Sequence, residues 1–216
     1  MGFFPDLMHV LFIHGMGRSP LSGWPMLRRL RRGGMQTSTF GYAVTFEDFA
    51  AIRDRLARRI QGMSAKGEYV LVGHSLGGVL LRAALNSLPE GTKPPIHVFL
   101  LGSPIQSARM ARKLSGNPVF RLLAGDCGQL LGSDERMAGV GAIPVATTGV
   151  AGVRGLSFKG GPFGDDANDG VVSLSEVSAD WMTSQVCIPV VHTLLPSSRQ
   201  VSEIILQRLA LVTGQD

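Results

Sequence analysis

The chain has 216 residues, enough for one domain with a full hydrophobic core. Hydrophobic residues make up 44% of the sequence and charged residues 17%, a balance that suits a compact α/β protein and excludes intrinsic disorder. The net charge is +5. Two cysteines, Cys127 and Cys187, are too few for a disulfide framework, and their apolar surroundings predict buried thiols.

Nothing in the sequence suggests a targeting or membrane-spanning segment. Residues 1–7 hold no basic region and no long apolar stretch, so no signal peptide is expected. No uncharged apolar run reaches the roughly 18 residues that a membrane span needs. These features favour a cytoplasmic protein.

Arginines gather in two clusters, residues 28–32 and 53–59. Both clusters fall on predicted helices, so a solvated outer face is the simplest interpretation. Attraction to anionic lipid headgroups or acidic substrates is the alternative. Nucleic-acid binding is not expected, because no aromatic platform is interleaved with the arginines.

Apolar strands alternate with helical patterns along the chain, which predicts an α/β fold with a mostly parallel sheet of about six strands and helices on both faces. The predicted strands are residues 10–13, 37–44, 68–72, 96–101, 143–150 and 186–191. The predicted helices are residues 25–32, a helix capped by Thr45 and running past Ile60, then residues 76–88, 106–114, 118–131 and 198–211.

No repeat, low-complexity tract or linker divides the sequence. Residues 1–216 are therefore expected to form a single domain. The weaker pattern over residues 103–142 indicates a small cap or substrate-facing excursion.

The most informative motif is Gly-His-Ser-Leu-Gly-Gly at residues 73–78, directly after the apolar run 69–72. Gly-x-Ser-x-Gly between a buried strand and a helix is typical of a nucleophile elbow. The sharp turn leaves little room for side chains two residues before and after Ser75, and it exposes the serine hydroxyl at the carboxyl end of the sheet. Ser75 is therefore the candidate nucleophile.

A serine hydroxyl needs a base to take its proton, and the base needs a third group to hold its tautomer. In an elbow fold, an acid and then a histidine follow the serine along the chain. Of the five histidines, only His192 lies both downstream of Ser75 and just past the end of a predicted strand. A lone histidine in apolar company is usually a core residue, but chain order and position favour His192 as the base.

Several carboxylates lie between Ser75 and His192 and qualify as the acid by chain order: Asp126, Asp134, Glu135, Asp165, Asp166, Asp169, Glu176 and Asp180. Asp169 is favoured because it lies in a turn before an apolar pair, where backbone amides can hold a carboxylate. Asp165 and Asp166 lie in a looser glycine-rich stretch and are expected to face water or the loop's own amides.

An oxyanion formed during acyl transfer needs two preorganised backbone amides. The residue after the nucleophile, Leu76, supplies one, and the loop after the first strand supplies the other, with Met16 as the expected donor. The supporting positions of this loop and of the elbow are His14, Gly15, Gly17, Gly73, His74 and Gly77.

Phosphate binding by the same loop is not favoured, because residues 15–17 lack the third glycine of a dinucleotide fingerprint and no Gly-Lys-Ser/Thr is present. The histidines are scattered, and no pair has the spacing of metal ligands on a helix. Neither a metal nor a cofactor is expected.

Together these motifs resemble the α/β-hydrolase superfamily, in its small bacterial lipase and esterase branch, from about His9 to Leu209. The resemblance rests on residues 12–17, 73–78, 101–104, 168–172 and 192–193. It implies a minimal α/β-hydrolase fold without the antiparallel hairpin that larger relatives place first. It also implies a Ser75–Asp169–His192 triad that cleaves carboxylic esters of small molecules or lipids through an acyl-enzyme.

Two other functions stay open at this point. A thioesterase or acyltransferase would use the same triad with a different substrate or acceptor, and a catalytically silent hydrolase fold would serve as a binding module. The arginine clusters and the apolar pieces between residues 105 and 131 also suggest peripheral contact with anionic membranes.

Overall fold

The computed structural model describes residues 8–155 and 160–214. The expectation about a signal peptide concerns residues 1–7, which lie outside the described residues. Six strands form one parallel sheet in the order β2-β1-β3-β4-β5-β6. The strands are β1 (His9–Ile13), β2 (Gln36–Phe40), β3 (Tyr69–His74), β4 (His97–Leu101), β5 (Thr147–Gly152) and β6 (Ser184–Ile188).

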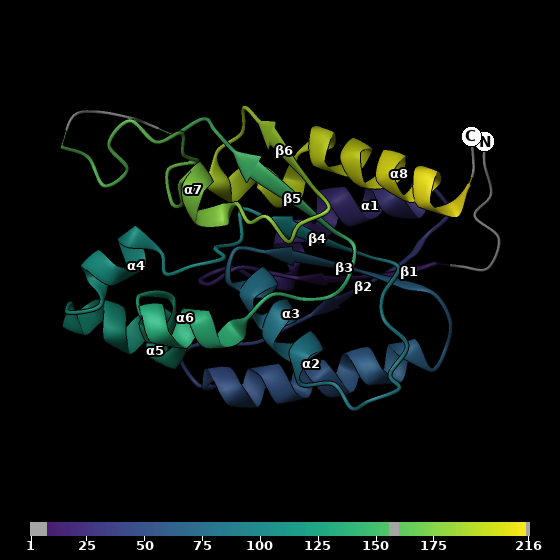
Figure 1. Ribbon diagram of the computed structural model, residues 1–216, viewed down its shortest axis with the longest axis horizontal. Helices are drawn as coiled ribbons and strands as arrows, with labels where there is room; N and C mark the ends of the chain where they lie inside the picture. The colour runs from purple at the N-terminus through teal and green to yellow at the C-terminus, as the bar shows by residue number, and fades with distance from the viewer. Residues whose placement is uncertain (1–7, 156–159, 215–216) are drawn as a thin grey trace.

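Helices cover both faces of this sheet, as the sequence predicts (Figure 1). One face carries α1 (Trp24–Arg32) and α8 (Arg199–Thr213), and the other carries α2 (Phe49–Ser64) and α3 (Leu76–Asn86). The remaining helices are α4 (Arg109–Leu114), α5 (Pro118–Leu131), α6 (Asp134–Val140) and α7 (Leu174–Val177), with short 3-10 turns at Pro20–Gly23 and His192–Ser197. The predicted fold class is confirmed.

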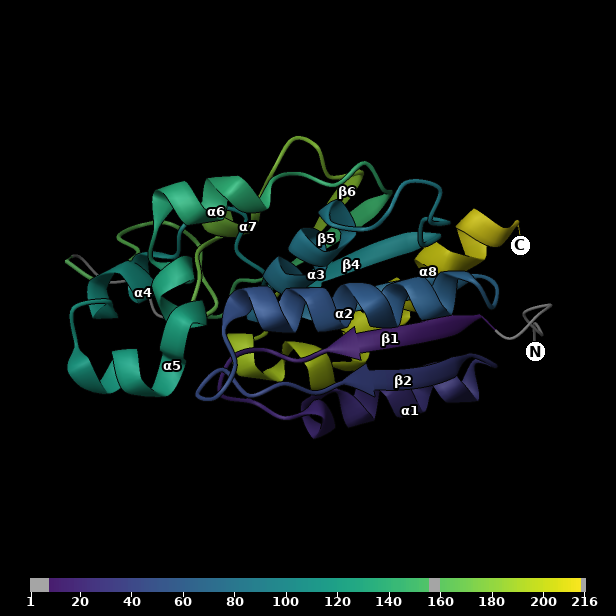
Figure 2. The same ribbon diagram turned by 90° about the horizontal axis from the view of Figure 1, so that it is seen from below.

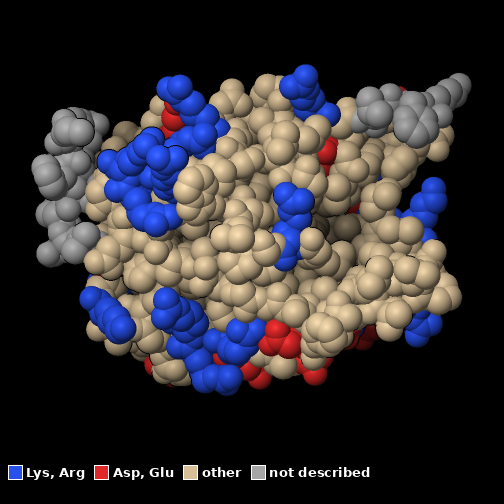
Figure 3. All heavy atoms as spheres, turned by 180° about the vertical axis from the view of Figure 1, so that it is seen from behind, with Lys and Arg blue, Asp and Glu red and all other residues tan. Residues whose placement is uncertain are grey.

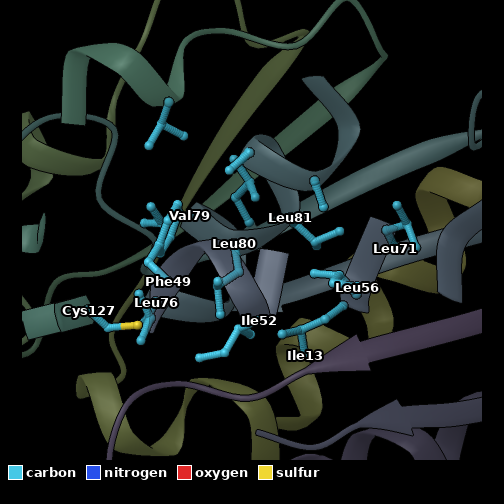
Figure 4. Packing of buried hydrophobic residues seen from close by; sticks show 14 of the residues in the cluster. Ile13, Phe49, Ile52, Leu56, Leu71, Leu76, Val79, Leu80, Leu81 and Cys127 are labelled. Carbon is cyan, nitrogen blue, oxygen red and sulfur yellow. The ribbon is translucent and has the colours of Figure 1, made fainter. Parts of the chain in front are cut away.

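Strand β1 shows how the sheet builds two cores. Successive side chains of a strand point to opposite faces. Leu11 and Ile13 therefore pack against α2 and α3, and Val10 and Phe12 pack toward α1 and α8. Figure 4 shows the first of these cores, which Cys127 joins from α5.

The chain changes direction across the sheet between two neighbouring strands, β1 and β3. After β1 it continues to α1 on one face, and after β3 it enters α3 on the other. Such a switch point opens a crevice at the carboxyl ends of the two strands, where ligands bind in open α/β sheets. The loop after β1 and the serine after β3 meet at this place.

Residues 103–142, named here the α4–α6 segment, lie beyond the carboxyl ends of the strands, toward which the arrows of β1 and β2 point in Figure 2. Two side chains of α3 bind backbone oxygens at the two ends of the α4–α6 segment. Arg82 donates to the carbonyl oxygens of Gly141 at 3.0 Å and Pro104 at 3.3 Å, and Asn86 donates to that of Val140 at 2.8 Å. Arg82 therefore fastens the beginning and the end of the segment to one helix.

Several predicted boundaries are wrong. Strand β2 ends at Phe40 rather than at residue 44, and helix α2 is capped by Asp48, whose Oδ1 accepts from the Ala51 N–H at 2.7 Å. Thr45 instead donates to the carbonyl oxygen of Leu123 at 3.0 Å. Strand β5 begins at residue 147 rather than 143, and β6 covers residues 184–188 rather than 186–191.

The two cysteines also differ from one another. Cys127 is buried as predicted, and burial raises the pKa of its thiol to about 12. Cys187 is exposed, so the prediction of a second buried thiol is wrong. Strand β6 lies at the edge of the sheet, where alternate side chains face away from the core.

The arginine clusters lie on the outer sides of their helices. Arg58 and Arg59 are exposed on α2, and the Arg28 guanidinium lies 5.3 Å from the ring centre of Trp24 on α1. Basic side chains gather in groups on the face shown in Figure 3. Among the described residues, no helix is long and apolar enough to cross a membrane.

Candidate active site

Ser75 occupies a strained turn between β3 and α3. Its φ of 54° and ψ of −126° make it the only non-glycine residue with positive φ in the described part of the chain. Its N–H donates to the carbonyl oxygen of Leu101 at the end of β4, at 2.9 Å. Positive φ costs free energy for any residue with a Cβ, so the surrounding contacts must hold this conformation.

The glycines of the elbow explain how the turn is packed. A Cβ added at Gly73 would lie 2.5 Å from the Cα of Gly78, so the strand and the helix touch across the serine. A Cβ at Gly77 would overlap the carbonyl oxygens of Ile13 and His14. Helix α3 is therefore pressed against the end of β1, which places the loop after β1 beside Ser75.

Asp169 and His192 meet in the interior. His192 Nδ1 lies 2.6 Å from Asp169 Oδ2, and both side chains are almost completely buried. The other carboxylate oxygen, Oδ1, accepts the N–H groups of Val171 and Val172 at 3.0 and 2.9 Å. The His192 N–H also donates to the Asp169 carbonyl oxygen at 2.9 Å. Backbone contacts thus orient the carboxylate and its partner together.

The neighbouring carboxylates have other contacts. Asp166 accepts from the Ser175 hydroxyl and forms an ion pair with Arg109 at 3.3 Å. Burial raises the pKa of its carboxyl, but the hydrogen bonds and then the Arg109 charge lower it by more, so that the pKa lies below its ordinary value. Asp165 is exposed. The structure therefore brings Asp169, rather than either neighbour, to His192.

His74 connects the elbow to the histidine loop. Its Nε2–H donates to the carbonyl oxygen of His192 at 3.1 Å, and the two imidazole rings lie 4.8 Å apart. Burial, and then the nearby His192, hold the pKa of His74 well below its ordinary value. A neutral His74 with its hydrogen on Nε2 therefore supports the backbone of His192 without adding charge.

The loop after β1 lies directly against the elbow. A Cβ at Gly15 would lie 3.0 Å from the Ser75 Cβ, which leaves room only for glycine. Met16 follows, and Gly17 has a φ of 66° that suits its lack of a side chain. Leu76 is the first residue of α3, so its N–H is among those that a helix leaves unpaired. Both expected oxyanion donors therefore belong to segments that flank Ser75.

His14 is fixed by an aromatic residue that the sequence does not reveal. Its ring stacks on Tyr42 with centroids 4.2 Å apart, and the Tyr42 hydroxyl donates to the His14 carbonyl oxygen at 2.7 Å. Burial lowers the pKa of His14 and raises the pKa of Tyr42. Tyr42 lies 28 residues from His14 in the sequence, so no local pattern could have found the contact.

Two further glycines make room for the acid and the histidine. A Cβ at Gly102 would lie 3.0 Å from His192 Nδ1, and one at Gly152 would lie 2.8 Å from the Asp169 Cβ. Gly102 directly follows β4, and Gly152 is the last residue of β5. That shared position at strand ends is the signal that could have found them.

Among the described residues, no group of three or more histidines, cysteines or carboxylates is arranged to hold a metal ion. The arrangement offers a hydroxyl on a strained turn, a buried imidazole held by a carboxylate, and backbone N–H groups at a helix start. This set of groups can perform nucleophilic acyl transfer.

The sequence matches the α/β hydrolase family over residues 10–203. No protein of curated function matches it by sequence. The mature lipase BlEst2 of Bacillus licheniformis has a similar structure, with a TM-score of 0.74 and 16% identity over 96% of this chain and 94% of that one.

The metagenomic carboxyl esterase MGS0156 gives a TM-score of 0.68 with 15% identity over 100% of this chain and 78% of that one. The thioesterase RedJ of Streptomyces coelicolor gives 0.60 with 15% identity over 95% and 86%. Fold and sequence therefore agree that the chain belongs to the α/β hydrolase family.

Proposed function

We propose that this protein is a carboxylic ester hydrolase that works through an acyl-enzyme, with Ser75 as nucleophile, His192 as general base and Asp169 as the acid that orients it. One observation carries the proposal. The buried 2.6 Å contact between Asp169 and His192 is joined to the Ser75 elbow, because the Nε2–H of His74 donates to the carbonyl oxygen of His192 at 3.1 Å.

The tautomer of His192 supports this assignment of roles. An ionised carboxylate can only accept hydrogen bonds, so the hydrogen of the imidazole lies on Nδ1 facing Asp169. Nε2 then keeps a lone pair that can take the proton of the Ser75 hydroxyl. Asp169 itself stays ionised and stabilises the imidazolium that forms.

In the acylation step, the Ser75 oxygen bonds to the carbonyl carbon of the ester while His192 takes the serine proton. The tetrahedral intermediate then collapses, the bond to the alcohol oxygen breaks, and His192 returns the proton to the leaving alcohol. In the second step, His192 takes a proton from water while the water oxygen attacks the acyl carbon. The bond to the Ser75 oxygen then breaks, and His192 returns the proton to that oxygen, which releases the carboxylic acid and free Ser75.

The backbone N–H groups of Met16 and Leu76 hold the oxyanion in both steps. Each such donor contributes about 100- to 1,000-fold in rate. Both come from segments that glycines bring against Ser75, so their positions depend on the packing at Gly15 and Gly77.

The test is hydrolysis of a p-nitrophenyl ester series of increasing acyl length by the wild type and by Ser75→Ala. We expect the variant to lose at least about 10⁴-fold in kcat/KM, because the groups of a triad act as a unit. Its thermal midpoint should stay close to that of the wild type. Ser87→Ala, an exposed serine at the end of α3, is the matched control and should keep full activity. Equal activity in Ser75→Ala would remove the proposed mechanism.

A thioesterase is the second candidate, because the thioesterase RedJ has a similar structure. Thioester substrates assayed beside the oxygen esters separate the two activities. An acyltransferase would instead transfer the acyl group to an added alcohol. A fluorophosphonate that fails to label Ser75, with no turnover of any ester, would leave a binding module as the function.

A further inference from the structure

Four large apolar side chains are exposed at the end of the molecule that carries the α4–α6 segment. Their exposed fractions are 88% for Phe46, 73% for Leu122, 63% for Val119 and 59% for Leu123. We name this group the apolar ridge. The Thr45 hydroxyl donates to the Leu123 carbonyl oxygen at 3.0 Å, so the loop carrying Phe46 lies beside the helix carrying the other three.

Helix α5 is kinked directly after the ridge residues. Gly125 has a φ of 53°, and its backbone lies so close to the Val44 carbonyl oxygen that a Cβ would overlap it. Beyond the kink, Cys127 and Leu130 pack into the core beside α3. Before the kink, Phe120 packs against the same core and Ala124 is buried, whereas Val119, Leu122 and Leu123 face outward. The ridge is thus a fixed part of the fold, and three of its residues share one short helical stretch.

The two sides of the ridge differ in charge. Beside Phe46, Glu47 forms an ion pair with Arg55 at 2.6 Å and Asp48 is exposed, whereas the side formed by α4 and the first half of α5 is basic. Residues 105–125 contain no aspartate or glutamate. Arg109 and Arg112 form ion pairs with Asp166 and Asp134. On the same segment, Lys113 and Arg121 are exposed, and neither has an ion-pair partner among the residues that the structure describes.

The ridge lies at the functional end of the molecule. The strands point toward α4 and α5 in Figure 2, and Ser75 follows the carboxyl end of one of them. In Figure 3 this end is mostly uncharged, with basic side chains at its outer edge. An apolar patch bordered by cations along its α4–α5 side matches the anionic headgroups and acyl boundary of a lipid bilayer.

A second copy of the chain fits this surface less well. A two-fold contact through the ridge would place Lys113 and Arg121 of both copies at one interface, because such contacts use the same patch twice. Like charges at an interface repel, whereas anionic headgroups neutralise them. The charges therefore favour a lipid surface as the occupant.

We propose that the apolar ridge inserts into the interfacial layer of an anionic bilayer, with Lys113 and Arg121 against the headgroups, and so presents the Ser75 end of the molecule to lipid. This docking is independent of the chemistry at Ser75. Its test therefore uses protein that carries Ser75→Ala. This variant cannot hydrolyse the lipids of the vesicle by the proposed mechanism.

Co-sedimentation with vesicles of phosphatidylcholine alone, or of equal parts phosphatidylcholine and phosphatidylglycerol, measures the partition coefficient. Leu122→Gln with Leu123→Gln should lower partitioning into the anionic vesicles about ten-fold, because binding scales with buried apolar area. The matched control is Leu211→Gln with Val212→Gln, which changes two exposed apolar residues near the end of α8. It should change partitioning less than two-fold.

The charge half of the proposal has its own pair of variants. Lys113→Gln with Arg121→Gln should weaken binding to anionic vesicles about 25-fold, since one basic residue near such a surface contributes about 1 kcal/mol, or about five-fold. Arg58→Gln with Arg59→Gln removes two exposed cations from α2 and should change binding little. All these side chains are exposed, so thermal midpoints should be preserved.

Three results would overturn the proposal. The first is equal partitioning into neutral and anionic vesicles. The second is an equal loss of partitioning in the control variants on α8 and α2, which would indicate a general effect of surface composition. The third is no partitioning into either kind of vesicle. If the protein also forms a concentration-dependent dimer, and Leu122→Gln with Leu123→Gln abolishes that dimer, the ridge binds a second copy of the chain.

Discussion

The surroundings of Ser75 and the α4–α6 segment lie at the same end of the sheet but are built in opposite ways. Around Ser75, glycines leave no space for a methyl group, and backbone N–H groups hold Oδ1 of Asp169. In the α4–α6 segment, leucines face solvent and exposed ion pairs join the helices. The packing around Ser75 tolerates almost no change in side-chain volume. The exposed side chains of the α4–α6 segment can instead contact different partners.

The largest effect that we expect in this comparison comes from Asp169→Asn. An amide keeps the shape of the carboxylate but presents an N–H to His192 Nδ1, so the imidazole carries its hydrogen on the wrong nitrogen. Ester hydrolysis should fall about 10³- to 10⁴-fold in kcat, with thermal stability nearly unchanged.

Asp166→Asn is the control for that experiment, because Asp166 belongs to the same loop and pairs with Arg109 of the α4–α6 segment. It should change kcat only a few-fold. An equal loss in both variants would show that the loop as a whole, rather than the Asp169 carboxylate, supports activity.

A pair of glycine substitutions compares the two regions by stability. Gly77→Ala should destabilise the fold by about 3 kcal/mol, because its Cβ overlaps the Ile13 and His14 carbonyl oxygens. Gly139→Ala, on the exposed side of α6, meets nothing within 4 Å and should stabilise the fold by about 0.5 kcal/mol through helix propensity. Urea unfolding measures both changes. A shift of the free energy of unfolding in the same direction for the two variants would contradict the comparison.

Between pH 7 and pH 5, acid should act on the sheet rather than on the α4–α6 segment, which contains no histidine. Burial, and then the nearby Arg208, lower the pKa of His97 to about 4. The unfolded chain binds this proton near pH 6.5, so the contribution of His97 is complete above pH 6.5 and is lost as the pH falls from there toward 4. This loss amounts to about 2 kcal/mol by pH 5.

The measurement is the free energy of unfolding at pH 7 and at pH 5, for the wild type and for His97→Gln. Glutamine can still reach the Thr148 hydroxyl that His97 Nε2 contacts at 2.8 Å, but it does not titrate. The variant should show a shallower pH dependence. A slope identical to that of the wild type would assign the acid sensitivity to His9, His14 and His74, whose pKa values burial also lowers.

The sequence predicted the sheet, its two helical layers and the family, because those features depend on local periodicity and on glycines next to a serine. Chain order and a strand end selected His192, and the turn before residues 171–172 favoured Asp169. The structure brings the two side chains together. Their roles and those of Met16 and Leu76 stay predictions until activity is measured.

The predictions that failed depend on contacts between distant residues. Thr45 and Asp48 are both good cap residues, and only the contact between Thr45 and Leu123 shows why Asp48 caps α2. Cys187 lies in an apolar stretch, but its strand is at the edge of the sheet and turns the thiol outward. The kink at Gly125 depends on the Val44 carbonyl oxygen and leaves no local pattern.

The position of Arg82 has a consequence for engineering. This one side chain binds carbonyl oxygens at both Pro104 and Gly141, so the α4–α6 segment leaves and rejoins the sheet domain at nearly the same place. Insertions are tolerated best where both ends of a segment are close together on the scaffold. The segment is therefore suited to exchange as a cassette: replacements of different length can be grafted between two fixed ends while the serine, the histidine and the acid keep their positions.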